Sequence, residues 1–228
     1  MSSLDKLKHS MFYQVLFPPE DQTQSRHFTL RKTYRYQIQP EESIRSATWV
    51  VFDLETTGFH KHSDRIIEVG ATKYRGQKEI ESFSSLVYTD VAIPPTVQSL
   101  TGIDPSMLVG KPTMTEVLPQ FLEFIQGSLL VCHNSAFDMN MLGAELQRQN
   151  IVVDYSCLCT LKMARDLLSH LANKKLVTIA EYFGFSYTTQ HRSLEDARVT
   201  GQVFQKMLDD APHLQKWKHM SLYAHTAS

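Results

Sequence analysis

Three strand-forming segments follow one another closely between residues 48 and 88. Residues 48–53 contain the apolar run Trp-Val-Val-Phe, residues 65–75 read RIIEVGATKYR, and residues 79–88 read EIESFSSLVY. Segments of this kind, rich in β-branched and aromatic residues, are typical of strands. Strands spaced this closely along the chain favour antiparallel pairing, so we expect a meander in this region.

The rest of the chain alternates between helical and strand patterns. Short apolar runs predict strands at residues 128–133 and near residues 152–157. Apolar residues at helical spacing predict helices at residues 115–126, 135–149, 160–171, 176–183 and 193–209. Three antiparallel strands followed by alternating helices and strands indicate the α/β class, with a mixed β-sheet flanked by helices.

The bulk composition suits one main domain with an appendage. The chain has 228 residues, of which 42% are hydrophobic, enough to bury a substantial core. Its formal net charge is only -1, so no global basic field attracts nucleic acid. Residues 1–45 are slightly basic, with seven Lys or Arg against five Asp or Glu. We therefore expect an N-terminal extension over residues 1–45, a main domain over residues 46–210 and a C-terminal tail over residues 211–228.

The three cysteines indicate a reducing compartment. Cys132, Cys157 and Cys159 lack the spacing of a zinc site, and an odd number argues against a disulfide framework. No apolar run approaches the ~18 residues that a membrane-spanning helix needs. The N-terminus also lacks the apolar stretch of a signal peptide. These features predict a cytoplasmic protein that does not insert into membranes.

Two carboxylates stand at the end of the first strand, in the stretch VVFDLETTGF at residues 50–59. Asp53 and Glu55 are two residues apart, so on a strand their side chains leave from the same face. Adjacent carboxylates repel each other unless a cation lies between them. A solvated strand end would explain an isolated pair. A metal site would need further carboxylates from elsewhere in the chain.

Two later stretches supply such carboxylates. Asp138 lies early in a predicted helix, where an acid is favourable next to the positive end of the helix dipole. His191 and Asp196 are five residues apart and cannot share one face of a helix, so His191 is placed on the loop before it. Ser193 is then expected to be the N-cap, with Asp196 as its capping-box partner. Each residue thus has an ordinary structural explanation when it is taken singly.

The order of these stretches resembles a known enzyme family. DLETTG (53–58), HNSAFD (133–138) and HRSLEDA (191–197) resemble the three motifs of the DnaQ-like 3′–5′ exonucleases, in the branch called DEDDh. Segments between the motifs are also similar to this family, above all to its DNA polymerase III epsilon and PolC-type members; they are DRIIEVGA (64–71), IPPTVQSLTGI (93–103) and IAEYFG (179–184). The resemblance covers about residues 46–210 and implies an RNase H-like fold.

The resemblance implies a two-metal phosphodiesterase. Asp53, Glu55, Asp138 and Asp196 would hold two divalent ions, Mg²⁺ or Mn²⁺, because such ions prefer several hard anionic oxygens. By the same analogy Asp53 would bridge the two ions. His191 would act as general base, a task that suits the ordinary pKa of histidine, about 6.5. The product would be a nucleoside 5′-monophosphate released from a 3′ end.

The resemblance also suggests which residues contact the substrate. The backbone around Thr56, Thr57 and Gly58 would approach the terminal nucleotide, because a glycine leaves room beside it. Leu100, Thr101 and Ile103 would line a base or ribose pocket. The alternative for the stretch LTGI is a helix end packed for stability. Glu68, on the second strand, is expected to be a structural acid or a neighbour of the metal ligands.

Several alternatives remain open from the sequence. The three motifs do not separate DNA from RNA, so a 3′–5′ exoribonuclease or a nuclease of short oligonucleotides on the same fold stays an alternative, although similarity to epsilon favours single-stranded or frayed 3′ ends of DNA. A non-catalytic nucleic-acid-binding module would normally have lost one of the five motif residues. A phosphatase with an aspartyl nucleophile would need a second aspartate where Glu55 stands.

The N-terminal extension is basic and aromatic around residues 31–37, which read RKTYRYQ. Such a pattern fits an edge strand packed on the domain, and it also fits an arm that follows a single strand of nucleic acid by charge and stacking. No polymerase domain is evident in the chain. Proofreading in DNA replication would therefore require a DNA polymerase partner, whereas DNA repair would not.

Overall fold

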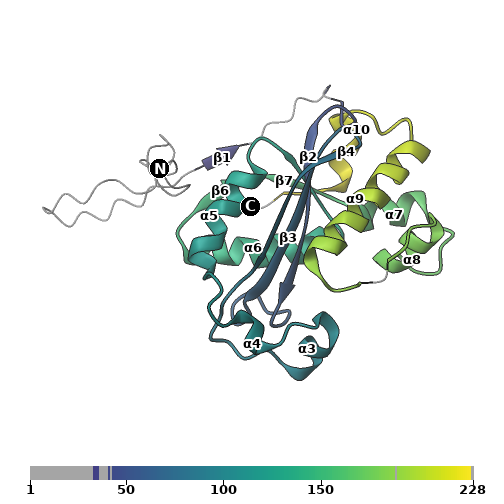
Figure 1. Cartoon of the computed structure of the whole chain (residues 1–228). Coiled ribbons are helices and arrows are strands. Elements are labelled where there is room, and N and C mark those ends of the chain that lie inside the picture. The colour runs from purple at the N-terminus through teal and green to yellow at the C-terminus, as the bar shows by residue number, and fades with distance from the viewer. Residues whose placement is uncertain (1–32, 36–40, 42, 188, 227–228) are drawn as a thin grey trace, which may run out of the picture. The chain divides into compact units, whose positions relative to one another are not determined.

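A computed structural model describes residues 33–35, 41, 43–187 and 189–226. Its centre is a six-stranded sheet in the order β4-β3-β2-β5-β7-β8 (Figure 1). The expected meander forms one half of the sheet, from β2 (Thr48–Thr56), β3 (Ile66–Arg75) and β4 (Lys78–Leu86). These strands pair antiparallel, with Glu55 opposite Glu68 and Asp53 opposite Gly70.

Parallel pairing begins on the other side of β2. Strand β5 (Leu129–Cys132) runs parallel to β2, and β7 (Ser156–Cys159) runs parallel to β5. The last strand, β8 (Ala224–Thr226), closes this edge antiparallel to β7. The mixed sheet, antiparallel first and parallel afterwards, confirms the predicted fold class, whereas β8 was not predicted.

The strand expected near residues 152–157 is in fact two strands. Strand β6 (Val152–Asp154) leaves the main sheet and pairs in parallel with β1 (Thr33–Arg35), whereas β7 joins β5. Tyr155, between the two strands, is buried in the core. The basic aromatic stretch at residues 31–37 thus contributes the strand β1, as expected for an edge strand, and its other residues lie outside the described part.

Helices cover both faces of the sheet (Figure 1). The helices α5 (Met114–Ile125) and α6 (Ser135–Arg148) pack on a core that includes Phe52 and Leu130. The helices α7 (Thr160–Leu167), α8 (Leu176–Tyr182) and α9 (Ser193–Asp210) pack on the opposite core, around Trp49 and Val131. Because successive residues of a strand face opposite sides, the apolar runs of β2 and β5 contribute side chains to both cores.

Short helices complete the fold. The end of α3 (Pro95–Thr101) lies at LTGI, where a helix end was one alternative, whereas α4 (Pro105–Leu108), α10 (Trp217–Met220) and the 3₁₀ turn η1 (Ser221–Tyr223) were not predicted. Helices of this length are marginal alone, so tertiary packing has to stabilise them. Within the described residues, no helix combines the length and apolarity needed to cross a membrane.

Segments on both sides of residues 46–210 pack on the domain. Ile44 is completely buried, and Arg45 forms a 2.7 Å ion pair with Asp209 on α9. Beyond α9, Met220 and Tyr223 are buried in the same core as Ile44. These four residues, which lie outside residues 46–210, therefore pack on the expected main domain.

Candidate active site

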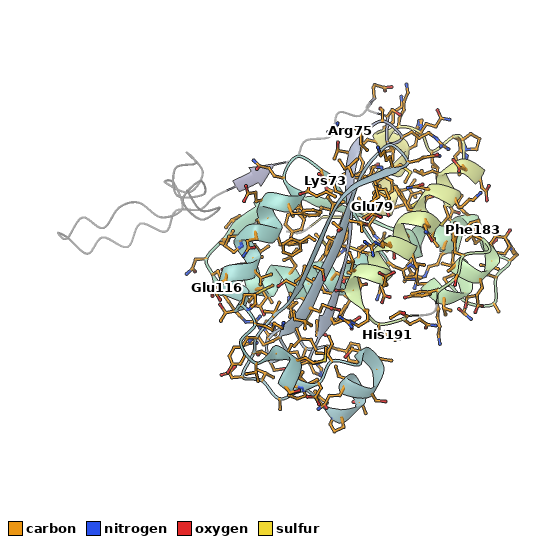
Figure 2. All side chains as sticks on the ribbon, viewed as in Figure 1. Lys73, Arg75, Glu79, Glu116, Phe183 and His191 are labelled. Atoms are coloured by element: carbon orange, nitrogen blue, oxygen red, sulfur yellow. The ribbon has the colours of Figure 1, made fainter. Side chains whose placement is uncertain are left out.

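The acidic residues that the sequence singled out converge at one end of the sheet. Asp53 and Glu55 lie near the carboxyl end of β2, and Asp138 lies in the first turn of α6, which follows β5. Since β2 and β5 are parallel, their carboxyl ends meet at the same edge. Asp196 lies in the first turn of α9, and His191 lies on the loop just before it (Figure 2).

Three of these side chains can contact a single ion. One ligand atom each from Glu55, His191 and Asp196 lies within 4.8 Å of the other two. Asp53 and Asp138 belong to the same electrostatic neighbourhood: the pKa of Asp53 is well above its usual range, because of burial first and then the charges of Asp138, Asp196 and Glu55. The structure thus brings all five motif residues together.

The pKa values of the site carboxylates lie above their usual range. Burial, followed by the charges of Asp196, Glu68 and Asp138, raises the pKa of Glu55 to about 8. Burial likewise raises the pKa of Asp138 to about 8. Several buried carboxylates that oppose one another's ionisation are a suitable donor set for divalent cations, whose charge would offset the repulsion. The residues therefore fit a metal centre.

Asp196 is held by two donors from the loop that precedes α9. The phenol of Tyr187 donates to Oδ1 at 2.6 Å, and the backbone N–H of His191 donates to Oδ2 at 3.1 Å. No pattern in the chain points to Tyr187, since nine residues separate it from Asp196. His191 is on the loop as predicted, but its φ of 59° lies in the left-handed region, which is uncommon for residues other than glycine.

The predicted cap of α9 is wrong by one position. The helix begins at Ser193 itself, and the N-cap is Arg192, whose side chain makes no capping bond. The backbone N–H of Ser193 instead donates to Oε2 of Glu68 on β3, at 2.9 Å. A buried carboxylate from the sheet thus satisfies one of the free N–H groups that every helix N-terminus presents, and the local serine is not needed for it.

The loop residues expected at the terminal nucleotide are partly engaged within the loop. The hydroxyl of Thr57 donates to Asp64 and accepts from the N–H of Arg65, and Thr56 Oγ1 donates to the carbonyl of Gly58 at 2.6 Å. A Cβ on Gly58 would lie 2.5 Å from Oδ2 of Asp64. The missing side chain of Gly58 thus leaves room for the Asp64 carboxylate, which accepts hydrogen bonds from Thr57 and from the N–H of His60.

The stretch LTGI is divided between packing and exposure. Thr101 is buried and bonds through its hydroxyl to the carbonyl of Val97 and the N–H of Ile103. Ile103 is completely buried in a small core with Ile67. Leu100, by contrast, is 53% exposed. Of these three residues, only Leu100 is free to contact a ligand directly, and the other two hold the end of α3 in place.

His133 is a further polar residue of this region that sequence reasoning did not single out. Its Nε2 bonds the carbonyl of Lys174 at 3.0 Å, and its Nδ1 lies 2.9 Å from Oγ1 of Thr160. Burial lowers its pKa to about 4, so the ring is neutral near pH 7. His133 therefore ties the turn that leads into α6, and hence Asp138, to two neighbouring segments.

A mixed sheet with buried carboxylates gathered at one end is suited to a metal-dependent hydrolase. Residues 50–204 match the RNase T family, which is described as an exonuclease family. The chain belongs to this family, which confirms the family assigned from the motifs.

Relatives and solved structures agree with this assignment. The chain is 38% identical over 174 residues to the DNA polymerase III subunit epsilon of Aquifex aeolicus, covering 76% of this chain and 86% of that protein. It is 40% identical over 168 residues to the PolC-type DNA polymerase III of Caldanaerobacter subterraneus, covering 74% of this chain but only 12% of the polymerase.

Two solved structures share the fold. Exonuclease X in complex with 5′ overhanging duplex DNA has a TM-score of 0.63 and 22% identity, covering 77% of this chain and 98% of that one. The nuclease domain of 3′hExo, a DEDDh family member bound to rAMP, has a TM-score of 0.64 and 16% identity, covering 82% and 99%. At these identities the likeness shows the fold, which is the expected RNase H-like one.

Proposed function

We propose that this chain is a 3′–5′ exonuclease that removes nucleoside 5′-monophosphates from single-stranded or frayed 3′ ends of DNA. The observation that carries the proposal is the convergence of four carboxylates and His191, from β2, α6 and the start of α9, at one end of the sheet. Asp53, Glu55, Asp138 and Asp196 would hold two divalent ions, Mg²⁺ or Mn²⁺. Such ions, when bound, activate water and stabilise the charge on the leaving 3′ oxygen.

The protein's own groups then have distinct tasks. His191 accepts the proton of the attacking water, since its ring lies beside Glu55 and Asp196. Tyr187 and the backbone of His191 hold the carboxylate of Asp196 in one orientation. The backbone of Thr56, Thr57 and Gly58 approaches the terminal nucleotide.

The α3 end supplies a second wall for the terminal nucleotide. Exposed Leu100 contacts it directly, whereas Thr101 and Ile103 support Leu100 from the core. Leu100 therefore contributes to binding through contact, and the other two residues contribute through the shape of the α3 end.

DNA is the preferred substrate class, because relatives matched over most of their length are subunits of a DNA polymerase. The same relationship supports association with a polymerase, and hence proofreading or repair in the cytoplasm. A 3′–5′ exoribonuclease is the second candidate, since a solved structure with the same fold is bound to rAMP. The catalytic unit is proposed to be residues 46–210, with residues 1–45 as an extension.

The test uses single-stranded DNA, matched RNA and mismatched duplex DNA, each labelled at the 5′ end. With Mg²⁺ or Mn²⁺, a ladder of progressively shorter labelled products is expected, faster on DNA than on RNA, and excess EDTA should abolish it. The variant Asp53→Ala, purified in parallel, controls for contaminating nucleases and should be at least ~10³-fold slower. Immediate release of labelled mononucleotide, or full activity in EDTA, would disprove the proposal.

A further inference from the structure

Glu68 is a buried carboxylate outside the five motif residues, and it is fully engaged with the start of α9. Its side chain is 2% exposed. Arg192 approaches it through two nitrogens, with Nη2 at 2.8 Å and Nε at 3.2 Å from Oε1, and the N–H of Ser193 lies 2.9 Å from Oε2. Both oxygens are thus occupied by donors from the two residues that directly follow His191.

The backbone that Glu68 holds is an unfavourable one. His191 has a φ of 59°, and a residue with a side chain persists in this region only where its surroundings over-determine it. The backbone N–H of His191 itself donates a hydrogen bond to Asp196. The next two residues, Arg192 and Ser193, are bound to Glu68. The strained residue is therefore fixed between two anchors.

Strand β3 supports the same segment a second time, two residues further on. Gly70 shares a face of the strand with Glu68, and a Cβ there would lie 2.1 Å from the backbone nitrogen of Leu194. The start of α9 thus rests directly on β3, with no side chain between them. This close contact sets the distance between the start of α9 and β3. The hydrogen bonds from Arg192 and Ser193 to Glu68 set the rotation of the helix start and the path of the preceding loop.

We propose that Glu68 is a positioning residue, which holds the His191 ring in its working orientation through Arg192 and Ser193. The inference rests on the proposed function, because it assigns Glu68 a part in the step that His191 performs. Both oxygens of Glu68 already accept hydrogen bonds from Arg192 and Ser193, so Glu68 acts on turnover through the segment it binds. Measuring kcat at saturating Mg²⁺ separates this role from the effect of its charge on Glu55. Glu68 should act on kcat and leave KM for DNA nearly unchanged.

A double-mutant cycle with His191→Ala tests this route. Glu68→Gln keeps the shape of the side chain but removes its charge and presents an amide to existing donors, so kcat should fall about 10- to 100-fold. In the His191→Ala background the same substitution should change kcat by less than about threefold, because residues that act as a unit are not additive. Equal losses in both backgrounds, or an unchanged kcat in Glu68→Gln, would overturn the proposal.

Glu79→Gln is the matched control. Glu79 on β4 forms a 3.5 Å ion pair with Arg198, which lies on α9 six residues after Arg192. This pair links the same helix to the same sheet, away from His191. This variant should keep the wild-type kcat. A loss in Glu79→Gln as large as that in Glu68→Gln would mean that any weakened contact between α9 and the sheet slows the enzyme, and it would contradict a specific role for Glu68.

Hydrogen exchange separates failure of this inference from failure of the proposed function. The amide of Ser193, bound to a buried carboxylate, should exchange slowly in the wild type and at least tenfold faster in Glu68→Gln, with amides beyond Val199 unaffected. If the wild-type protein degrades no nucleic acid, the proposed function fails, and this measurement still decides whether Glu68 fixes the segment. Unchanged protection of Ser193 would refute the positioning role in either case.

Discussion

Tyr187 donates a 2.6 Å hydrogen bond to Oδ1 of Asp196, although the two residues belong to different segments of the fold, a loop and the first turn of α9. A hydrogen bond to a metal-binding carboxylate orients it, and loss of such a partner typically weakens metal affinity by 10- to 100-fold. We therefore expect loss of this hydrogen bond to change the Mg²⁺ concentration that the enzyme needs.

Tyr187→Phe is expected to raise the Mg²⁺ concentration needed for half-maximal activity by about tenfold, with kcat at saturating Mg²⁺ close to the wild-type value. The measurement is the initial rate on labelled single-stranded DNA across a Mg²⁺ titration. Tyr182→Phe removes the hydroxyl of a half-exposed tyrosine on α8 and serves as the control. An unchanged Mg²⁺ midpoint in Tyr187→Phe would show that Asp196 needs no help from the phenol.

Metal-free protein should lose stability as the pH rises from 7 to 8. Glu55 and Asp138, with pKa values of about 8, keep protons in the folded state that the unfolded chain has already released, so their contribution is present at low pH and lost as pH passes through 8. The pKa of His133 is lowered to about 4, so its contribution to stability is complete above about pH 7. His133 therefore does not change the free energy of unfolding between pH 7 and 8.

Asp138→Asn should therefore raise the melting temperature in EDTA at pH 8 by about 5 °C and flatten its decline between pH 7 and 8, since about 1 kcal/mol corresponds to 2–4 °C in a protein of this size. Circular dichroism melts give the measurement, and Asp90→Asn, at an exposed aspartate, is the control. The variant should also lose most of the stabilisation by Mg²⁺ that the wild type shows. A wild-type melting temperature that rises with pH in EDTA would contradict the assignment.

His191→Ala should slow turnover by about 10²- to 10⁴-fold, the usual contribution of a general base. Binding of DNA, followed by fluorescence anisotropy in Ca²⁺, should stay within about threefold of the wild type. His213→Ala, at an exposed histidine beyond α9, should leave the single-turnover rate unchanged. A His191→Ala rate equal to that of the wild type would eliminate His191 as the base.

Gly70→Ala should destabilise the protein by about 3 kcal/mol or more, because its Cβ would overlap the backbone of Ser193 and Leu194 and push α9 away from β3. Gly143→Ala provides the opposite case. Gly143 lies inside α6 with no atom within 4 Å of an added Cβ, so alanine should stabilise by about 0.5–1 kcal/mol. Urea denaturation measures both changes. Similar values for the two variants would show that the contact between α9 and β3 relaxes easily.

Local patterns in the sequence determined most elements of this fold and all five motif residues. The apolar runs of β2, β3 and β5 and the helical spacing of α5, α6 and α9 reflect periodicities that the chain carries in itself. Asp53, Glu55, Asp138, His191 and Asp196 were found because their order along the chain resembles that of a family. Neither kind of information requires knowledge of which segments are neighbours in space.

Only the tertiary structure decided how these residues are held. Glu68 caps α9 in place of Ser193, Tyr187 orients Asp196, and Asp64 fills the space beside Gly58. The short α3, α10 and β8 are stabilised by packing on the rest of the domain, because segments of this length have little stability of their own. Hydrogen bonds and contacts between residues far apart in sequence leave no periodic signal, and they become visible only when the chain has folded.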